Sequence, residues 1–339
     1  MVAPPWYPVP PNGYGGIELV VHLLVQELKR DGHRVSLFAS KGSSYGTNEF
    51  AEEAWREDLG FPHGYYRELT FIARVYKKIS KLKSLDLIHD HMLIGLLAAS
   101  FIKDVPALHT VHGSISEIER TLYHEFSEDI KFAAISDFQK KQAPELPWAG
   151  TAYNAVDIKN LHRAHAPANP PYLLLLARIT PEKGQHIAIS VAKSLNMRLV
   201  LAGKVDSGTG GKYFAEQINP HIDGDKVVYI PQVAGEQKAS LLSGATVALA
   251  PLMWEEPFGL FMAEAMVSGT PVVAFPRGAA PEIILPGTSG FLVADEQEMV
   301  DAIKEIGSID RKACAKYARE RFSPKVMAKK YLEIYNDIL

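Results

Sequence analysis

The sequence predicts an α/β protein of two doubly wound domains that face each other across a cleft. The chain has 339 residues, which is too long for one ordinary core and enough for two domains of about 100–200 residues each. Short apolar runs alternate with helical patterns, and runs of consecutive apolar residues are typical of parallel strands covered on both faces. A polar segment with prolines at 157–171 divides this pattern in two.

The first half is predicted to hold four strands and a long first helix. The expected strands are 34–39, 85–89, 107–112 and 132–135. The helix is expected over 17–31, because apolar residues recur there at helical spacing and Gly32 follows its end. Alternation of strands and helices implies right-handed βαβ units. This half gives a first domain over 1–157.

The second half repeats the pattern with six expected strands. They are 172–177, 198–202, 227–230, 247–251, 271–275 and 290–293. The second domain is therefore predicted over 158–323, with a last helix at 324–339. Ligands of such folds bind at the carboxyl ends of the strands.

Composition and charge exclude several classes of protein. The formal net charge of −3 gives no electrostatic reason to expect nucleic acid as a partner. The single cysteine, Cys314, cannot form an internal disulfide, which suits a reducing cytoplasm. The start of the chain lacks the basic and apolar parts of a signal peptide, and no apolar run reaches about 18 residues. We expect a cytoplasmic protein.

Two glutamates flank a turn in the second half. Glu256 precedes Phe258, Gly259 and Leu260, which lead into an apolar helix that contains Glu264. The start of a helix presents unpaired N–H groups that can hold an anion or sugar hydroxyls. A carboxylate in such a helix can accept hydrogen bonds from a ribose. A capped core helix with two solvated acids explains the spacing equally well.

Arg178 and Lys183 follow the first expected strand of the second half. A guanidinium at the strand end with a lysine nearby suits a diphosphate, whose negative charge both would offset. Gly184 allows a tight turn after them. A solvated loop with incidental charges is the alternative.

Two further candidates lie in the first half. Gly15 and Gly16 end a glycine-rich loop that opens onto a helix, and such a loop lets backbone N–H groups approach a phosphate closely. His112 ends an expected strand and precedes a glycine, so its side chain can reach a ligand. An ordinary turn and a structural histidine are the respective alternatives.

Other polar segments favour simpler interpretations. His89 and His91 would share one face of a strand without a third ligand in view, so we expect no metal there. Asp223 and Asp225 lie in a polar turn. The basic segment 65–84 could lie on an anionic membrane, but a core helix with a solvated basic face is favoured.

Together these segments resemble the retaining glycosyltransferase family four, whose GT-B fold has two Rossmann-like domains. The resemblance covers nearly the whole chain. It includes Gly15-Gly16, Leu87 to His91, Thr110 to Gly113, Asn154 to Asp157, Arg178 to Gly184, Leu201 to Gly203, the E-x7-E pair Glu256 and Glu264, Gly269 to Val273, and Gly278 to Glu282.

The resemblance implies a role for each candidate. Arg178 and Lys183 would hold the diphosphate of a nucleotide-sugar donor together with the backbone of Gly15 or Gly16. Glu264 would bind the ribose. The transferred sugar would contact His112, Glu256 and the backbone of Phe258, Gly259 and Leu260.

The resemblance also implies the reaction. A sugar would pass to a hydroxyl acceptor (a sugar, glycolipid or small molecule) with retained anomeric configuration and without a metal or other cofactor. The last helix would cross back onto the first domain. A weak peripheral membrane contact is possible. An epimerase of the same fold and a catalytically silent sugar-nucleotide-binding protein remain as alternatives.

Four features depart from the family's pattern, among them Ala279-Ala280 where many members have two glycines and Ile230 to Val233 where a glycine-bearing turn is usual. Only Met1 to Ala3 remain where members usually have a longer first strand, so we expect either a shortened strand or a mis-set start of the sequence. No aromatic platform for an acceptor is obvious, although Trp6, Tyr7, Tyr14 and Tyr45 are candidates for that side.

Overall fold

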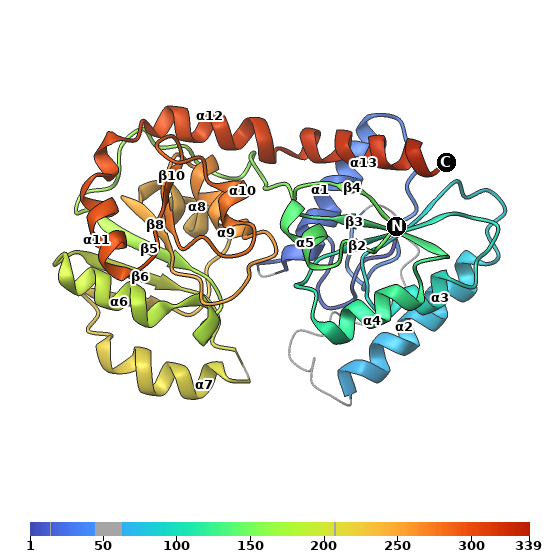
Figure 1. Ribbon diagram of the computed structural model, residues 1–339, viewed down its shortest axis with the longest axis horizontal. Coiled ribbons are helices and arrows are strands. Elements are labelled where there is room, and N and C mark those ends of the chain that lie inside the picture. Colours follow the sequence, from blue (N-terminus) through green and yellow to red (C-terminus); the bar gives the residue numbers. More distant parts are fainter. Residues whose placement is uncertain (14, 45–62, 207) are drawn as a thin grey trace. The chain divides into compact units, whose positions relative to one another are not determined.

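The computed structural model describes residues 1–13, 15–44, 63–206 and 208–339. Tyr14 and Tyr45 therefore lie outside the described residues. The chain divides into two compact units, residues 1–155 with 324–339 and residues 156–323. Each unit contains one parallel sheet with helices (Figure 1). The predicted α/β class with two parallel-sheet domains is confirmed.

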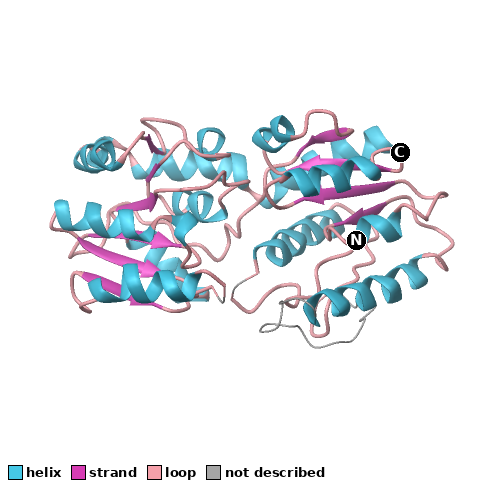
Figure 2. Cartoon of the chain, turned by 60° about the horizontal axis from the view of Figure 1, so that its bottom comes forward, coloured by secondary structure: helices cyan, strands magenta, loops and turns pink. Residues whose placement is uncertain are grey.

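The second unit has a six-stranded parallel sheet, drawn in magenta in Figure 2. Its strands are β5 (Tyr172–Leu176), β6 (Arg198–Ala202), β7 (Val227–Ile230), β8 (Val247–Ala250), β9 (Val272–Ala274) and β10 (Gly290–Leu292). Their order in space is β10-β9-β8-β5-β6-β7. The chain thus builds the sheet outward from β5 on one side and from β8 on the other, which makes the junction of β5 and β8 a switch point where doubly wound sheets bind ligands.

Helices connect these strands. They are η1 (Pro181–Lys183), α6 (Gln185–Ser194), α7 (Gly210–Tyr213), η2 (Phe214–Ile218), η3 (Asn219–His221), α8 (Gly235–Gly244), α9 (Leu260–Val267), α10 (Ala280–Ile283), α11 (Glu296–Lys304), η4 (Ile306–Ser308) and α12 (Arg311–Phe322). Every residue of α9 from Met262 to Val267 is buried. That burial explains why its sequence is apolar on all sides rather than amphipathic.

The first unit has a four-stranded parallel sheet in the order β1-β2-β3-β4. Its elements are α1 (Gly16–Arg30), α2 (His63–Ile79), β1 (Ile88–Asp90), α3 (Gly95–Ala99), β2 (Ala107–Val111), α4 (Glu117–Glu125), β3 (Ile130–Ala134), α5 (Asp137–Gln142), β4 (Trp148–Thr151) and α13 (Pro324–Ile338). The last helix packs against α1 within this unit (Figure 1).

The start of the chain extends this sheet by single bridges. Val2 bridges Phe38 on one side and Asp90 on the other, both in parallel. The predicted strand 34–39 is therefore wrong in extent, because only Phe38 pairs. The first strand is as short as the sequence suggests, and it occupies the position between Phe38 and β1.

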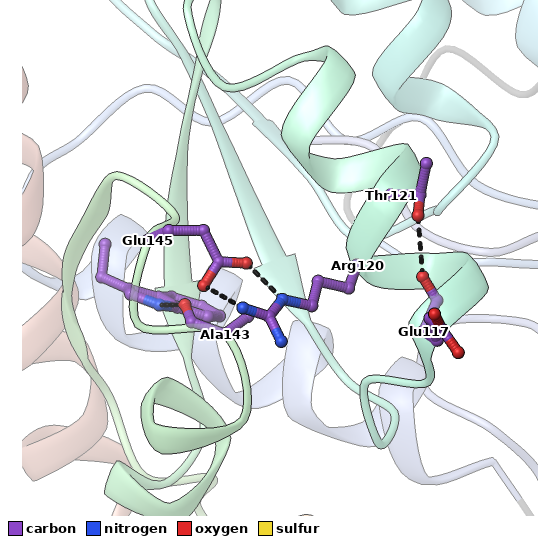
Figure 3. A network of polar contacts seen from close by, with 6 residues as sticks. Glu117, Arg120, Thr121, Ala143 and Glu145 are labelled. Atoms are coloured by element: carbon purple, nitrogen blue, oxygen red, sulfur yellow. Dashed lines mark hydrogen bonds and ion pairs between the residues drawn. The ribbon is translucent and has the colours of Figure 1, made fainter.

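Sequence analysis missed β4. All four of its residues are half-buried, so no run of apolar residues marks it. Two contacts in Figure 3 lie at its start: the indole N–H of Trp148 donates to the carbonyl of Ala143 (2.8 Å), and Arg120 of α4 makes a two-pronged ion pair with Glu145. The strand pairs with β3 and contacts the last helix, α13, which comes from the other end of the chain.

The basic helix α2 belongs to the core. Phe71, Ile72, Val75 and Ile79 are buried in the hydrophobic core of the first unit, while its basic residues are mostly exposed. The alternative in which the apolar face of this helix lies on a membrane is therefore wrong. Among the described residues, no helix is long and apolar enough to span a bilayer.

Replacing Gly290 by Ala should destabilise the second unit. A Cβ atom there would lie 1.9 Å from the carbonyl oxygen of Val272, so β9 and β10 would have to separate. We expect a loss of about 1–3 kcal/mol, measured by denaturant unfolding. Gly211→Ala is the control, because its Cβ would meet nothing within 4 Å and alanine favours the helix. Equal midpoints for the two variants would contradict this packing.

Candidate functional site

Lys183 and Glu256 meet at the switch point of the second sheet. Lys183 ends η1, which follows β5, and Glu256 follows β8. The ammonium and the carboxylate form an ion pair, with the two side chains 15% and 13% exposed. The ammonium also lies 4.5 Å from the centre of the Trp254 ring. A carboxylate and an aromatic face thus hold one cation in place.

Glycines make this approach possible. Gly184 has a φ of 69°, and a Cβ there would lie 2.1 Å from the carbonyl oxygen of Pro251. Gly278 has a φ of 58°, and its Cβ would lie 2.2 Å from the carbonyl oxygen of Glu256. That carbonyl also accepts a hydrogen bond from the N–H of Ala279 (2.8 Å). Backbone therefore packs directly on backbone on both sides of the ion pair.

The turn before α9 presents backbone rather than side chains. Phe258 is buried against the ring of Phe322, so only its main chain can serve a ligand. Gly259 caps the helix with a φ of 87°, and Leu260 begins it. The start of this eight-residue helix carries a partial positive charge.

These elements line one small hollow. Its walls are Leu175, Ala177, Lys183, Leu249, Ala250, Leu252, Glu256, Gly259, Phe261 and Met262. Three residues that the sequence singled out, Lys183, Glu256 and Gly259, therefore share one site. Apolar residues at the carboxyl ends of β5 and β8 form much of the remaining wall.

The other two charged candidates have partners of their own. Glu264 is almost buried and accepts a hydrogen bond from the ammonium of Lys238 in α8 (2.6 Å). Arg178 pairs with Asp206 (3.1 Å), and both side chains are partly exposed. Sequence reasoning missed Lys238 and Asp206, because no spacing distinguishes them from other surface charges. Trp254 is the first residue of the segment that contains the two glutamates, but sequence reasoning assigned it no role.

In the first unit, the glycine loop rests on a buried acid. Gly15 has a φ of 145°, and a Cβ there would lie 2.7 Å from Cβ of Pro11 and 3.1 Å from the Glu18 carboxylate. Gly16 is the first residue of α1. Glu18 is 1% exposed, and burial raises its pKa to about 7. Glycine is required at 15 because the loop closes over this carboxyl.

His112 belongs to a cluster of histidines in the first unit. Its Nε2 lies 2.8 Å from Nδ1 of His91. His89 contacts two hydroxyls at 2.7 Å each, that of Tyr335 through Nδ1 and that of Thr110 through Nε2. Burial lowers the pKa of His89, His91 and His112 below the ordinary value, so these rings are neutral near pH 7.

A buried acid lies beside this cluster. Asp90 accepts hydrogen bonds from the Tyr76 hydroxyl and from the N–H of Met92, and burial raises its pKa to about 7. Within the described ranges, no group of three histidine, cysteine or acidic side chains is placed to hold a metal ion.

Comparison with known proteins identifies the family. Residues 14–170 match Glycosyltransferase Family 4, and residues 157–321 match Glycosyl transferases group 1. The chain belongs to glycosyltransferase family four. The predictions of the family and of an enzyme that transfers a sugar are confirmed.

Full-length relatives and solved structures agree. A phosphatidyl-myo-inositol mannosyltransferase of Mycobacterium leprae is 24% identical, over 100% of this chain and 96% of that protein. A sucrose-phosphate synthase of Thermosynechococcus elongatus has a TM-score of 0.81 at 18% identity, over 99% and 98% of the two chains. Anabaena HepE, solved with UDP-glucose, has a TM-score of 0.73 at 20% identity, over 96% of each chain. These neighbours show the GT-B fold.

The glycosyltransferase should lose stability in acid through its first unit. His89, His91, His109 and His112 have folded pKa values below 6.5, so the unfolded chain gains their protons as the pH falls through about 6.5. Glu18 and Asp90 act oppositely, because their folded pKa values near 7 let the folded state take up protons first. The buried N-terminal ammonium, whose pKa burial lowers to about 6, adds to the effect of the histidines until the pH falls to that value. Below it, four histidines against two acids leave about two protons, or up to ~2.7 kcal/mol per pH unit.

The variant His109→Phe tests this balance. His109 is buried beside the rings of Tyr123 and Phe132, so phenylalanine keeps an aromatic contact and removes one titrating group. We expect the slope of unfolding free energy between pH 6.5 and 5 to fall by ~1.4 kcal/mol per pH unit. His33→Gln, at an exposed position, is the control. An unchanged slope in His109→Phe would contradict the assignment.

Proposed function

We propose that this glycosyltransferase moves a sugar from a nucleoside diphosphate sugar to a hydroxyl acceptor, retains the anomeric configuration and needs no metal ion. The observation that carries the proposal is the hollow at the switch point of the second sheet. There Lys183, Glu256 and the start of α9 supply a cation, a carboxylate and backbone N–H groups in one place. A nucleotide sugar needs these three kinds of group.

Lys183 and Arg178 would hold the diphosphate. As the bond between the sugar and the phosphate breaks, the leaving nucleotide gains negative charge, and fixed positive groups lower the barrier by stabilising that charge. The backbone of Gly15 or Gly16 would add N–H groups. Lysine, arginine and helix dipoles thus supply the positive charge that a metal ion supplies in other transferases.

Glu256 would hold the transferred sugar rather than attack it. Its carboxylate already accepts a hydrogen bond from the Lys183 ammonium. A carboxylate that is engaged in an ion pair is a poorer nucleophile. Departure and attack would then occur on one face of the sugar. The acceptor oxygen forms the new bond to the anomeric carbon while its proton passes to the leaving phosphate, which retains the configuration.

The remaining candidates would bind the rest of the donor. Glu264 would accept hydrogen bonds from the ribose hydroxyls, with Lys238 fixing its orientation through their ion pair. The backbone of Phe258, Gly259 and Leu260 would contact the sugar together with His112. That HepE was solved with UDP-glucose supports a donor of this class.

A donor screen followed by two variants tests the proposal. A ligand that binds only the folded state raises its stability, so one of the UDP, GDP, ADP or dTDP sugars should raise the melting temperature. With that donor, Arg178→Ala and Lys183→Ala should each lower turnover by about 10²-fold or more. Lys212→Ala, at an exposed lysine of the same unit, should not.

The other outcomes separate the alternatives. An epimerase would convert the nucleotide sugar without an acceptor, and a silent binding protein would show the thermal shift without turnover. Normal turnover in both Arg178→Ala and Lys183→Ala would refute the role of these residues. The anomeric configuration of the product, read by NMR, tests retention. Full activity in the presence of a chelator tests metal independence.

A glycolipid is the acceptor class that we favour. The Mycobacterium leprae relative is named as acting on phosphatidyl-myo-inositol. On this chain, α2 and the residues after it expose several basic side chains, among them Lys77, Lys81 and Lys83. Because the apolar face of α2 is buried in the core, such a membrane contact would be electrostatic and weak.

This contact predicts binding to anionic vesicles. The triple variant K77A/K81A/K83A should bind vesicles of phosphatidylserine and phosphatidylcholine about 10²-fold more weakly than the unchanged protein, since each basic side chain contributes about 1 kcal/mol near such a surface. The control triple K212A/K304A/K316A removes three exposed lysines of the second unit. Sedimentation measures both. Equal loss in the two triples, or binding to pure phosphatidylcholine, would count against a specific contact.

A further inference from the structure

His91 is held rigidly beside His112. The two residues directly follow β1 and β2, which are neighbours in the parallel sheet. The N–H of His91 donates to the carbonyl of Val2 (3.1 Å), and its side chain is 3% exposed. Its ring lies between those of His89 and His112, with centres 4.1 and 5.1 Å away. The ring therefore has little freedom to turn.

The two rings are joined by one hydrogen bond, in which one nitrogen donates and the other accepts. Nδ1 of His91 lies 2.8 Å from Nε2 of His112, which is hydrogen-bond distance. A neutral imidazole has one N–H and one acceptor nitrogen. Because burial keeps both rings neutral, one of these two nitrogens carries the proton and the other accepts it.

The environment of His91 decides which one donates. Its other nitrogen, Nε2, is buried and has no hydrogen-bond partner among the described residues. If the proton were on Nε2, a buried N–H would be left unpaired, and such groups are rarer in proteins than unpaired acceptors. With the proton on Nδ1, the hydrogen bond to His112 forms and only a lone pair remains unpaired. His91 is therefore the donor.

We propose that His91 is a positioning residue that fixes His112 in the tautomer with its proton on Nδ1. The hydrogen bond from His91 occupies the Nε2 lone pair of His112, so the neutral ring can donate only through Nδ1. This inference rests on the proposed function, in which His112 contacts the transferred sugar. It makes that contact a hydrogen bond from Nδ1–H to a sugar or phosphate oxygen.

His89 supports the arrangement from the other side. Its two ring nitrogens contact the hydroxyls of Tyr335 and Thr110, and Thr110 also contacts the hydroxyl of Tyr331 (3.0 Å). Both tyrosines come from α13. The His89 ring that His91 contacts is thus held in place by the last helix of the chain.

Two variants of nearly equal shape test the inference. In asparagine the amide nitrogen is as many bonds from Cβ as Nδ1 is in histidine, so asparagine at 91 keeps a hydrogen-bond donor. Leucine has a methyl group at that position and cannot donate. We expect His91→Leu to lower kcat by about 10–100-fold with little change in the KM of the donor. His91→Asn should recover most of the loss. His112→Ala combined with His91→Leu should be no worse than His112→Ala alone, because both act through one ring.

A spectroscopic measurement reports the tautomer directly. In ¹⁵N NMR of the full chain, the signals assigned to His112 should show Nδ1 protonated in the unchanged protein and a shift toward Nε2–H in His91→Leu. A purely structural role for His91 would lower stability without moving this tautomer. The measurement on the unchanged protein stands even if a variant fails to fold.

The outcomes separate this inference from the proposed function. Protonation of His112 on Nε2 in the unchanged protein would overturn it, as would normal kcat in His91→Leu alongside an inactive His112→Ala. Normal activity in His112→Ala would instead remove the role of His112 itself. An unchanged protein that turns over no donor would refute the proposed transfer while leaving the tautomer measurable.

Discussion

The parallel pairing of β5 with β8 is the constraint on which the second unit depends. Leu173 and Leu174 pair with Val247 and Ala248, although residues 177–246 separate the two strands. Since the strands run in the same direction, the segments that leave their carboxyl ends begin side by side. Lys183 follows one end and Glu256 the other. Gly184 lets the segment after β5 approach the carbonyl oxygen of Pro251, and Gly278, which follows β9, lets a third segment approach the carbonyl oxygen of Glu256.

Each charged candidate of this unit is matched by an opposite charge. Lys183 pairs with Glu256, Glu264 with Lys238, and Arg178 with Asp206. Burying an unpaired charge costs free energy, and a partner of opposite charge lowers that cost. Of the three pairs, only Lys183 with Glu256 lines the hollow, and the pair of Arg178 with Asp206 is the most exposed. The pairing thus fixes the orientation of these side chains, and it does so least for the more exposed Arg178.

In the first unit, hydrogen bonds between neutral groups fix the side chains, as ion pairs do in the second unit. Val2 takes the place of a first strand between Phe38 and β1, and the histidines follow the next two strands. Their burial removes charge, so hydrogen bonds decide where each proton sits. The tyrosines of α13 complete this network, which explains why the end of the chain belongs to the unit that contains its start.

The sequence by itself determined the fold class and most strands, because consecutive apolar residues are needed wherever a sheet is covered on both faces. Strands 198–202 and 227–230 have the predicted bounds. It also selected Lys183, Glu256 and Gly259, since motif spacing along the chain reflects position at the strand ends. Only the tertiary structure decided β4, whose Gly150 leaves room for Ile334 of α13. It alone revealed the pairing of Lys238 with Glu264 and of His91 with His112, because contacts between distant segments leave no periodic pattern in a single sequence.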